Sequence, residues 1–384
     1  MVSRRIILIT GGAGVALAGA CALRLHSNLA AARAPWSEAG ESFGDARLDA
    51  LAYAVLAPSP HNLQPWLVRL DGDDGLTLFC DLGRRLPATD PLDRQTVIGL
   101  GAFVELLRQA AAEKGYGLEL DLFPEGEAFP VLDARPIASM RFVEDAQIAK
   151  DPLFAALLTR RTSRTPYDQA RPVSAETMNA LDAALRAGDG EFEWVSDAAN
   201  VEALKTICRE AWITEMQTPG PRNESAIWTR IGEKEINAAP DGISLYGPVM
   251  EAMGAVGLLS QKAMNDPETT AFAETVKFYN RNIDTAMAFG WLSTANNTRT
   301  DQLRAGAGWV RLQQAAAGLG LAMQPLSQAL QEYPAMGEIY EEIHDFAGIR
   351  LPARMQGIFR FGYAKTEPAS PRWPMESRLI DADA

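Results

Sequence analysis

The stretch Ala57-Pro58-Ser59-Pro60-His61-Asn62-Leu63-Gln64-Pro65-Trp66 carries the densest structural and chemical signal in the chain. Its three prolines restrict the backbone and remove N–H donors, and the polar side chains among them lie directly before a strand expected at 66–70. These polar residues are Ser59, His61, Asn62 and Gln64. A rigid polar loop of this kind suits recognition of a flat polar heterocycle, but a turn that caps the preceding helix would use the same residue types.

Apolar periodicity outward from this loop predicts an α+β fold, with helices and strands in alternation. In the first part we expect helices over 45–57 and 94–114 and strands over 66–70, 76–80, 118–123 and 137–142. In the second part we expect helices over 152–160, 175–187, 199–216 and 300–318 and strands near 191–195, 320–325 and 356–361.

An internal sequence repeat indicates two related halves. Gln109-Ala-Ala-Ala-x-x-Gly115 is matched by Gln314-Ala-Ala-Ala-x-x-Gly320, and each is preceded by a Gly-x-Gly pair, 99/101 and 306/308, with a spacing that differs by two residues. We therefore divide the chain into an export signal and linker (1–34), a first half (35–150) and a second half (151–384). A Gly-, Pro- and Met-bearing insertion at about 218–278 is a candidate lid, although Met-bearing helices are also common in cores.

Composition excludes several classes of function. The 384 residues hold 36 Lys and Arg against 49 Asp and Glu, a net charge of −13 that opposes binding to nucleic acid. Three Cys and three widely separated His form no zinc or iron–sulfur pattern, so we expect no metal.

The first 37 residues contain no Asp or Glu, which is typical of a targeting segment. Arg4 and Arg5 before a weakly apolar run resemble a twin-arginine export signal, which predicts a periplasmic or otherwise exported protein. Small-residue cleavage sites end at Ala20 and Ala32; an uncleaved membrane anchor and a lipidated Cys21 are the alternatives. Ile6–Gly14 also reads as a dinucleotide-binding turn, but it lacks the third glycine and the later acid that such a turn needs.

Arg160-Arg161-Thr162-Ser163-Arg164 places three guanidinium groups in five residues of an acidic chain. Arginine binds phosphate through paired charge-assisted hydrogen bonds, so this cluster is a candidate anion site, with solvated surface charge as the alternative. Arg372 adds one more arginine near the C-terminus. Gly318–Gln328 forms a helix-to-strand junction whose backbone N–H groups could face a ligand, although an ordinary helix cap explains it equally well.

Together these stretches resemble the nitroreductase superfamily, and within it the two-repeat, single-chain branch called Acg-like. The resemblance covers most of residues 40–375 and implies a pseudo-dimer of two α+β units that binds flavin mononucleotide (FMN). It implies that Arg160, Thr162 and Arg372 hold the phosphate, within a cluster that includes Arg161, and that Arg164 lies near the pyrimidine edge. It also implies that backbone N–H groups of Gly320, Leu321 and Ala322 face the flavin N5. The first half would contribute Pro58, Ser59 and Asn62, with Gln64 of the same motif.

The proline-rich loop occurs only in the first half and the arginines only in the second, so we expect one flavin site per chain. The resemblance implies two-electron hydride transfer through N5 to a small molecule or a redox partner protein. Because nicotinamide nucleotides are cytoplasmic, an exported enzyme would need another donor, such as a quinol. His61 is a weak candidate for the proton donor and otherwise a structural member of its loop. The alternative function is FMN storage under a lid. The pseudo-dimer could act as a monomer or associate as a homodimer.

Overall fold

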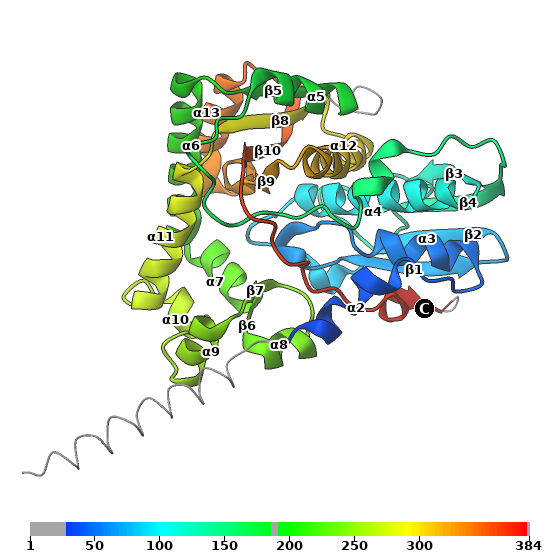
Figure 1. Cartoon of the computed structure of the whole chain (residues 1–384), viewed down its shortest axis with the longest axis horizontal. Helices are drawn as coiled ribbons and strands as arrows, with labels where there is room; N and C mark the ends of the chain where they lie inside the picture. The colour runs from blue at the N-terminus through cyan, green and yellow to red at the C-terminus, as the bar shows by residue number, and fades with distance from the viewer. Residues whose placement is uncertain (1–27, 186–190, 382–384) are drawn as a thin grey trace, which may run out of the picture.

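The computed structural model describes residues 28–185 and 191–381 and confirms the predicted α+β class, with two units of matching plan (Figure 1). The arginine pair at residues 4 and 5, Cys21 and the cleavage site ending at Ala20 lie outside the described residues. No helix among the described residues is long and apolar enough to cross a bilayer.

The first unit contains α3 (Ala46–Ala54), β1 (Trp66–Asp71), β2 (Gly75–Cys80), α4 (Arg94–Glu113), β3 (Tyr116–Leu122) and β4 (Ala138–Glu144). The second contains α5 (Ala175–Leu185), β5 (Glu191–Val195), β8 (Ala288–Thr294), α12 (Arg299–Gly318), β9 (Ala322–Pro325), α13 (Gly337–Phe346) and β10 (Arg354–Gly362). Strand order is β1-β2-β4-β3 in one sheet and β5-β8-β10-β9 in the other, with antiparallel neighbours throughout. The two units therefore share one topology.

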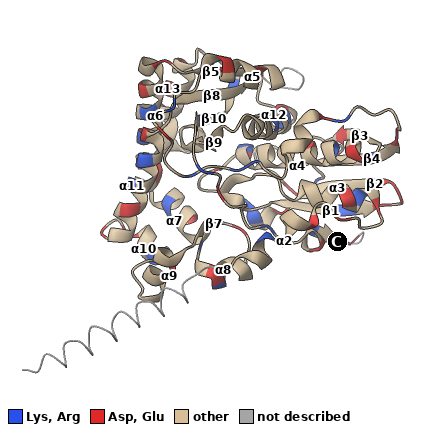
Figure 2. Cartoon of the chain, viewed as in Figure 1, with Lys and Arg blue, Asp and Glu red and all other residues tan. Residues whose placement is uncertain are grey.

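The second unit differs by a long segment between β5 and β8, where the first unit has the turn 72–74 between β1 and β2. The segment contains α6 (Ala198–Gln217), α7 (Pro219–Ile227), β6 (Thr229–Ile231), α8 (Gly232–Ala238), β7 (Ile243–Leu245), α9 (Pro248–Ala255), α10 (Gln261–Asn265) and α11 (Thr270–Asp284). We call residues 196–287 the helical segment. Figure 2 shows acidic and basic residues interspersed along α6, where Lys205 and Arg209 both pair with Glu202.

Segments at the two chain ends join the first unit. The chain after β10 crosses back from the second unit and ends in β11 (Leu379–Ile380), which pairs in parallel with β1 (Figure 1). Near the N-terminus, α2 (Ala30–Glu38) packs beside α3 and α8. Residues 30–34, expected to belong to the export linker, are therefore part of the fold.

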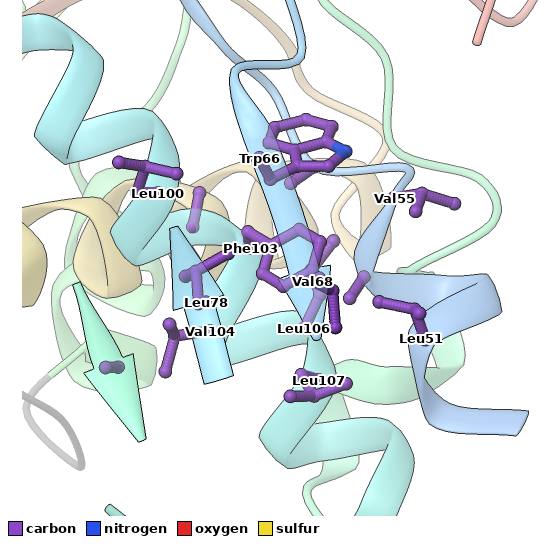
Figure 3. Close-up of a cluster of buried hydrophobic side chains, with 14 of the residues drawn as sticks. Leu51, Val55, Trp66, Val68, Leu78, Leu100, Phe103, Val104, Leu106 and Leu107 are labelled. Carbon is purple, nitrogen blue, oxygen red and sulfur yellow. The ribbon is translucent and has the colours of Figure 1, made fainter. Parts of the chain in front are cut away.

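The core of the first unit lies between its sheet and the helices α3 and α4 (Figure 3). Leu51 of α3, Val68 of β1 and Phe103 of α4 are fully buried there. Each such side chain contributes about 1.5–3 kcal/mol when it leaves water. This packing fixes the end of α3, from which the proline-rich loop begins.

The helices α4 and α12 pack against each other through glycines. A Cβ on Gly101 would lie 2.0 Å from the carbonyl oxygen of Leu303, and a Cβ on Gly306 would lie 2.0 Å from that of Ile98. Gln109 and Gln314 exchange side-chain hydrogen bonds of 3.0 and 2.7 Å across the pair. Gly306 follows Gly101, as Gln314 follows Gln109, by 205 residues. The equivalent glycines are thus 101 and 306, and the expected two-residue difference in spacing disappears.

One expected helix is much shorter in the structure. Residues 152–160 form only a short 3-10 helix, Pro152–Ala156, because the chain then extends to place Thr162 beside Met323 of β9. The strand β8 was not predicted. It is buried along almost its whole length and so lacks the alternation of a half-exposed strand.

Candidate anion-binding site

Arg160 and Arg372 meet in the interior between the two units. Their side chains are 2% and 3% exposed. Arg160 donates to the carbonyl oxygen of Leu56 and, over 2.8 Å, to Oε1 of Gln313. Arg372 donates to the carbonyl oxygens of Leu56 and Ala57, each at 3.0 Å. The structure therefore brings the two predicted phosphate ligands together at the end of α3.

The guanidinium groups of this cluster have no carboxylate partner among the described residues, although Glu367 accepts from the backbone N–H of Arg164 over 2.6 Å. Within the described residues, Arg160, Arg161, Arg164 and Arg372 form no ion pair with a carboxylate, and the buried Nε atoms of Arg160 and Arg372 have no hydrogen-bond partner. Burial, together with the charges of Arg164 and Arg161, lowers the pKa of Arg372 to about 9. Burial and the charge of Arg372 also lower the pKa of Arg160. An anion bound here would relieve this repulsion and occupy the free donors, so the residues fit a phosphate group.

Trp36 of α2 covers the cluster. The guanidinium carbons of Arg160, Arg161 and Arg372 lie 5.5, 4.8 and 5.6 Å from the centre of its ring, within the range of cation–π attraction. Its indole N–H donates to the carbonyl oxygen of Ser370 over 2.8 Å. Sequence reasoning missed this residue because it lies next to the segment interpreted as a linker. An aromatic residue four positions after the end of a cleavage motif was the available signal.

The other residues of the arginine stretch have separate positions. Arg161 is half-buried and donates to the carbonyl oxygens of Leu158 and Arg160 at 2.8 and 2.7 Å. The hydroxyl of Thr162 accepts from the Gln313 amide over 3.0 Å, and Gln313 also binds Arg160. Arg164 is exposed. Thr162 thus shares its partner with the buried arginine, whereas the side chain of Arg164 lies at the surface.

The proline-rich loop is held in an uncommon backbone conformation. His61, Asn62 and Gln64 have φ angles of 48°, 56° and 54°, a region that costs non-glycine residues on the order of 1–3 kcal/mol each. Its neighbours hold it there: the side chain of Asn62 accepts from Arg372 and donates to the Pro371 carbonyl over 3.1 Å. Pro58 and Ser59 are half-buried, and Gly99 of α4 leaves room for Ser59.

Gln64 does not present its amide to a ligand, contrary to the expectation. The side chain is fully buried. Its amide donates to the carbonyl oxygens of Asn62 and Pro240 and accepts from the backbone N–H of Trp373 over 2.8 Å. Gln64 therefore positions the loop against the helical segment and the C-terminal segment.

The junction at Gly320 also differs from the expectation. The N–H groups of Gly320 and Leu321 donate to the carbonyl oxygens of Ala317 and Ala316, and Gly320 has a φ of 65°. This is the Schellman arrangement that closes a helix C-terminus. Neither N–H is available to a flavin N5, so the helix-cap alternative holds for both. Ala322 begins β9 beside Gly362 of β10.

His61 contacts the helical segment. Its Nε2 lies 2.9 Å from Oγ of Ser225 on α7, and that hydroxyl donates to Oε1 of Glu215 on α6 over 3.0 Å. Burial, with a contribution from the charge of Arg164, lowers the pKa of His61 to about 4. The ring is therefore neutral near pH 7.

Asp241 joins the helical segment to the first unit and to the C-terminal segment. It pairs with Arg84 and Arg230, each over 2.8 Å, and accepts from the indole N–H of Trp373 over 2.9 Å. Burial raises the pKa of Asp241, but the hydrogen bonds from Arg84 and Trp373 and the two positive charges outweigh it, so the pKa lies below its ordinary value. The carboxylate stays ionised and fixes Trp373, the residue next to Arg372.

Comparison with known proteins supports the resemblance seen in the motifs. No protein-family model matches the chain. Two Mycobacterium tuberculosis proteins named "Putative NAD(P)H nitroreductase" are similar. One is 25% identical over 346 residues, which cover 85% of this chain and 91% of the relative. The other, Acg, is 34% identical over 124 residues, 31% of this chain and 34% of the relative.

An uncharacterized M. tuberculosis protein is 33% identical over 123 residues, 31% of this chain and 35% of that protein. The matches to this protein and to Acg thus span about a third of each relative's length. The crystal structure of the FMN-dependent nitroreductase NfnB from Mycobacterium smegmatis with NADPH is 19% identical, covering 57% of this chain and 92% of that chain at a TM-score of 0.35. The sequence relatives confirm the resemblance to nitroreductases.

Proposed function

We propose that this protein is an exported FMN-dependent oxidoreductase of the nitroreductase type. One observation carries the proposal: two buried arginines, supplied by the second unit and aligned by carbonyls of the first, lack any anionic partner among the described residues. The two relatives named as NAD(P)H nitroreductases indicate which anionic cofactor to expect.

In this proposal Arg160 and Arg372 bind the FMN phosphate, with Thr162 held beside them through Gln313. Bound FMN would supply two-electron chemistry as hydride transfer at N5. Ser59 and Asn62 position the cofactor from the first unit, and Trp36 shields the guanidinium groups from water. The exposed Arg164 is the candidate for the pyrimidine edge, where a cation would stabilise negative charge on the ring.

The direct test is cofactor content. Purified full-length protein should be yellow, with about one FMN per chain. Arg372→Gln should weaken FMN binding by about 30-fold or more, because truncating one member of a desolvated charge pair costs at least about 2 kcal/mol. The matched control is Arg378→Gln, a buried arginine six residues further along the same segment that lies near Asp81. Colourless protein that does not take up FMN, or equal affinities of the two variants, would contradict the proposal.

The second candidate is an FMN-storing protein without turnover. It is favoured by the contacts that the helical segment makes with the proline-rich loop, through Pro240 to Gln64 and Ser225 to His61. Stopped-flow reduction of FMN-loaded protein, followed by exposure to menadione, separates the two functions. Rapid reoxidation supports the enzyme, whereas a reduced flavin that persists for minutes supports storage.

For export, we propose that cleavage occurs before Cys21. The alternative site ends at Ala32, which is buried in α2, donates its N–H to Asn237 and accepts from the N–H of Arg372 over 2.8 Å. Cleavage there would remove contacts that support the arginine cluster. Fractionation of the native cells with N-terminal sequencing tests this, and a mature N-terminus at Arg33 would contradict it. An exported enzyme would take electrons from a quinol or a redox partner protein.

A further inference from the structure

A continuous hydrogen-bonded chain joins a buried carboxyl group to the proline-rich loop. Glu215 on α6 is 2% exposed and accepts at Oε1 from the hydroxyl of Ser225, which in turn lies 2.9 Å from Nε2 of His61. The second oxygen of Glu215, Oε2, accepts from the amide N–H of Gln331 over 2.9 Å. A proton on Oε1, the oxygen that faces Ser225, leaves the bond from Gln331 undisturbed.

We propose that Glu215 and Ser225 form a proton relay that reprotonates His61, and that His61 donates the proton that accompanies hydride transfer. This proposal rests on the proposed flavin function. None of these three residues belongs to the arginine cluster. Two of them lie on the helical segment, so the relay would give that segment a role beyond covering the site.

The hydrogen-bond directions give the relay two states. When Glu215 is ionised, the Ser225 hydroxyl donates to it, so Ser225 can only accept from His61 and the ring carries its proton on Nε2. When Glu215 is protonated, its O–H donates to Ser225, whose hydroxyl then turns to His61 Nε2, and the ring proton moves to Nδ1. A neutral imidazole has one donor and one acceptor nitrogen, so the state of Glu215 selects the tautomer of His61.

The surroundings of the relay place its switching near neutral pH. Burial raises the pKa of Glu215 to about 7, although hydrogen bonds from Gln331 and Ser225 oppose the shift, and Glu224 on α7 adds to it. Tyr279 on α11 and Tyr333 are the other titratable side chains that face Glu215. At the opposite end, Arg164 faces His61 and helps to keep the ring neutral.

The proton transfer balances without a further oxidant or reductant. An organic acceptor receives two electrons and one hydrogen as hydride, and one proton remains to be supplied. His61 releases its Nδ1 proton to the reduced acceptor while Nε2 receives the Ser225 hydroxyl proton, and Ser225 is restored by the proton of Glu215. Glu215 is left as a carboxylate and the ring carries its proton on Nε2. For the next turnover Glu215 regains a proton from solvent, and the ring loses its Nε2 proton to solvent and takes one on Nδ1, so that one proton is consumed in total.

The relay can be tested without flavin. The chain has only three histidines, His26, His61 and His344, so ¹⁵N-histidine labelling of the full-length protein gives an interpretable imidazole spectrum. His344 is an internal reference: its Nδ1 lies 2.7 Å from the Tyr340 carbonyl and its Nε2 accepts from the N–H of Met355, which fixes the Nδ1–H tautomer. We expect His61 to change from the Nδ1–H to the Nε2–H form as pH rises through about 7.

Glu215→Gln should abolish this change between pH 5.5 and 8.5, and Ser225→Ala should do the same with Glu215 intact. The matched control is Glu224→Gln, which removes a buried carboxyl group that binds Thr89 instead of Ser225. A single His61 tautomer across the pH range in the wild type, or a switch that persists in Glu215→Gln, would overturn the relay.

Kinetics on FMN-loaded protein give the second readout. With menadione as acceptor, Glu215→Gln and Ser225→Ala should reoxidise at least about tenfold more slowly than the wild type and lose its pH dependence near 7, since a positioned general acid contributes about 10²–10⁴-fold. The Glu224→Gln control should keep the rate and a pH-dependent profile, with its midpoint moved toward lower pH because Glu215 loses a neighbouring negative charge. Unchanged FMN content in these variants separates the two proposals: failure to bind FMN would contradict the proposed function, whereas normal binding with unchanged rate and pH profile would overturn the relay.

Discussion

Gly306→Ala tests whether the packing of α4 against α12 holds the two units together. The new methyl carbon would lie 2.0 Å from the Ile98 carbonyl oxygen and 2.8 Å from the Ala102 nitrogen, both backbone atoms that no side-chain rotation can move away. Close carbon–oxygen contacts across helices are about 3.3 Å, so α12 would have to recede by about 1.3 Å. The whole helix contact would open by a similar distance.

Overpacking of a core costs about 1–3 kcal/mol, and a gap of 0.5–1 Å forfeits a quarter to a half of the dispersion attraction at each contact. We therefore expect a loss of about 3 kcal/mol or more. For a 384-residue chain the unfolding entropy is about 0.8 kcal/mol per kelvin, so the Tm should fall by about 4 °C. FMN binding should weaken in parallel, because the arginine cluster contacts both units.

The control is Gly318→Ala at the end of the same helix, where a Cβ meets nothing within 4 Å. Alanine is the better helix former by up to about 1 kcal/mol, so this variant should be as stable as the wild type or slightly more so. The assay is thermal unfolding followed by circular dichroism, with FMN titration by fluorescence. Equal melting temperatures for the two variants would refute the close contact between α4 and α12.

Three further predictions concern the arginine cluster, the contacts of Asp241 and the α4–α12 pair. Trp36→Ala should weaken FMN binding about tenfold, because the three guanidinium groups lose their aromatic cover, as isothermal titration calorimetry would measure. Asp241 has a pKa below its ordinary value, so the stability that it contributes is present above about pH 4 and is lost as pH falls through its folded pKa. Asp241→Asn should therefore lower the Tm at pH 7 and show a smaller loss than the wild type on acidification. Gln314→Leu alone should cost about 1–3 kcal/mol by leaving the buried Oε1 of Gln109 without its donor, whereas the double Gln109→Leu/Gln314→Leu variant should recover part of this in a urea double-mutant cycle.

The sequence predicted the parts of the site that are local. The proline-rich loop and the arginine-rich stretch 160–164 are contiguous polar clusters. The repeated Gln-Ala-Ala-Ala motif lies in two strongly periodic helices. The structure places the loop, Arg160 and Arg372 together as expected. The pairing of Gly101 with Gly306 needed the structure, because only the contact between α4 and α12 shows which glycine of each pair lies at the crossing.

Other features could not be predicted because they depend on contacts distant in sequence. Glu215 and Ser225 carry no motif, and they matter only because the helical segment places them 154 and 164 residues beyond His61 in sequence yet in one hydrogen-bonded chain with it. Gly320 fits equally well a ligand-facing backbone and a helix cap, and only the hydrogen bonds of its N–H and that of Leu321 decide between them. Strand β8 was missed because full burial removes the alternation that identifies a strand.

Joining two units in one chain permits an asymmetry that a homodimer cannot have. In an isologous dimer every insertion occurs twice, once on each side of the axis. Here residues 196–287 stand between β5 and β8, whereas the equivalent strands β1 and β2 are joined by residues 72–74. The hydrogen bond of Asp241 with Trp373 and the contact of Ser225 with His61 both come from this single segment. The two sheets and the α4–α12 pair are symmetric in topology. The contacts made by Asp241 and Ser225 have no counterpart in the short turn of the first unit. The second unit can therefore carry the arginines and the helical segment while the first supplies the loop, and under the proposed function this arrangement would give one flavin site per chain.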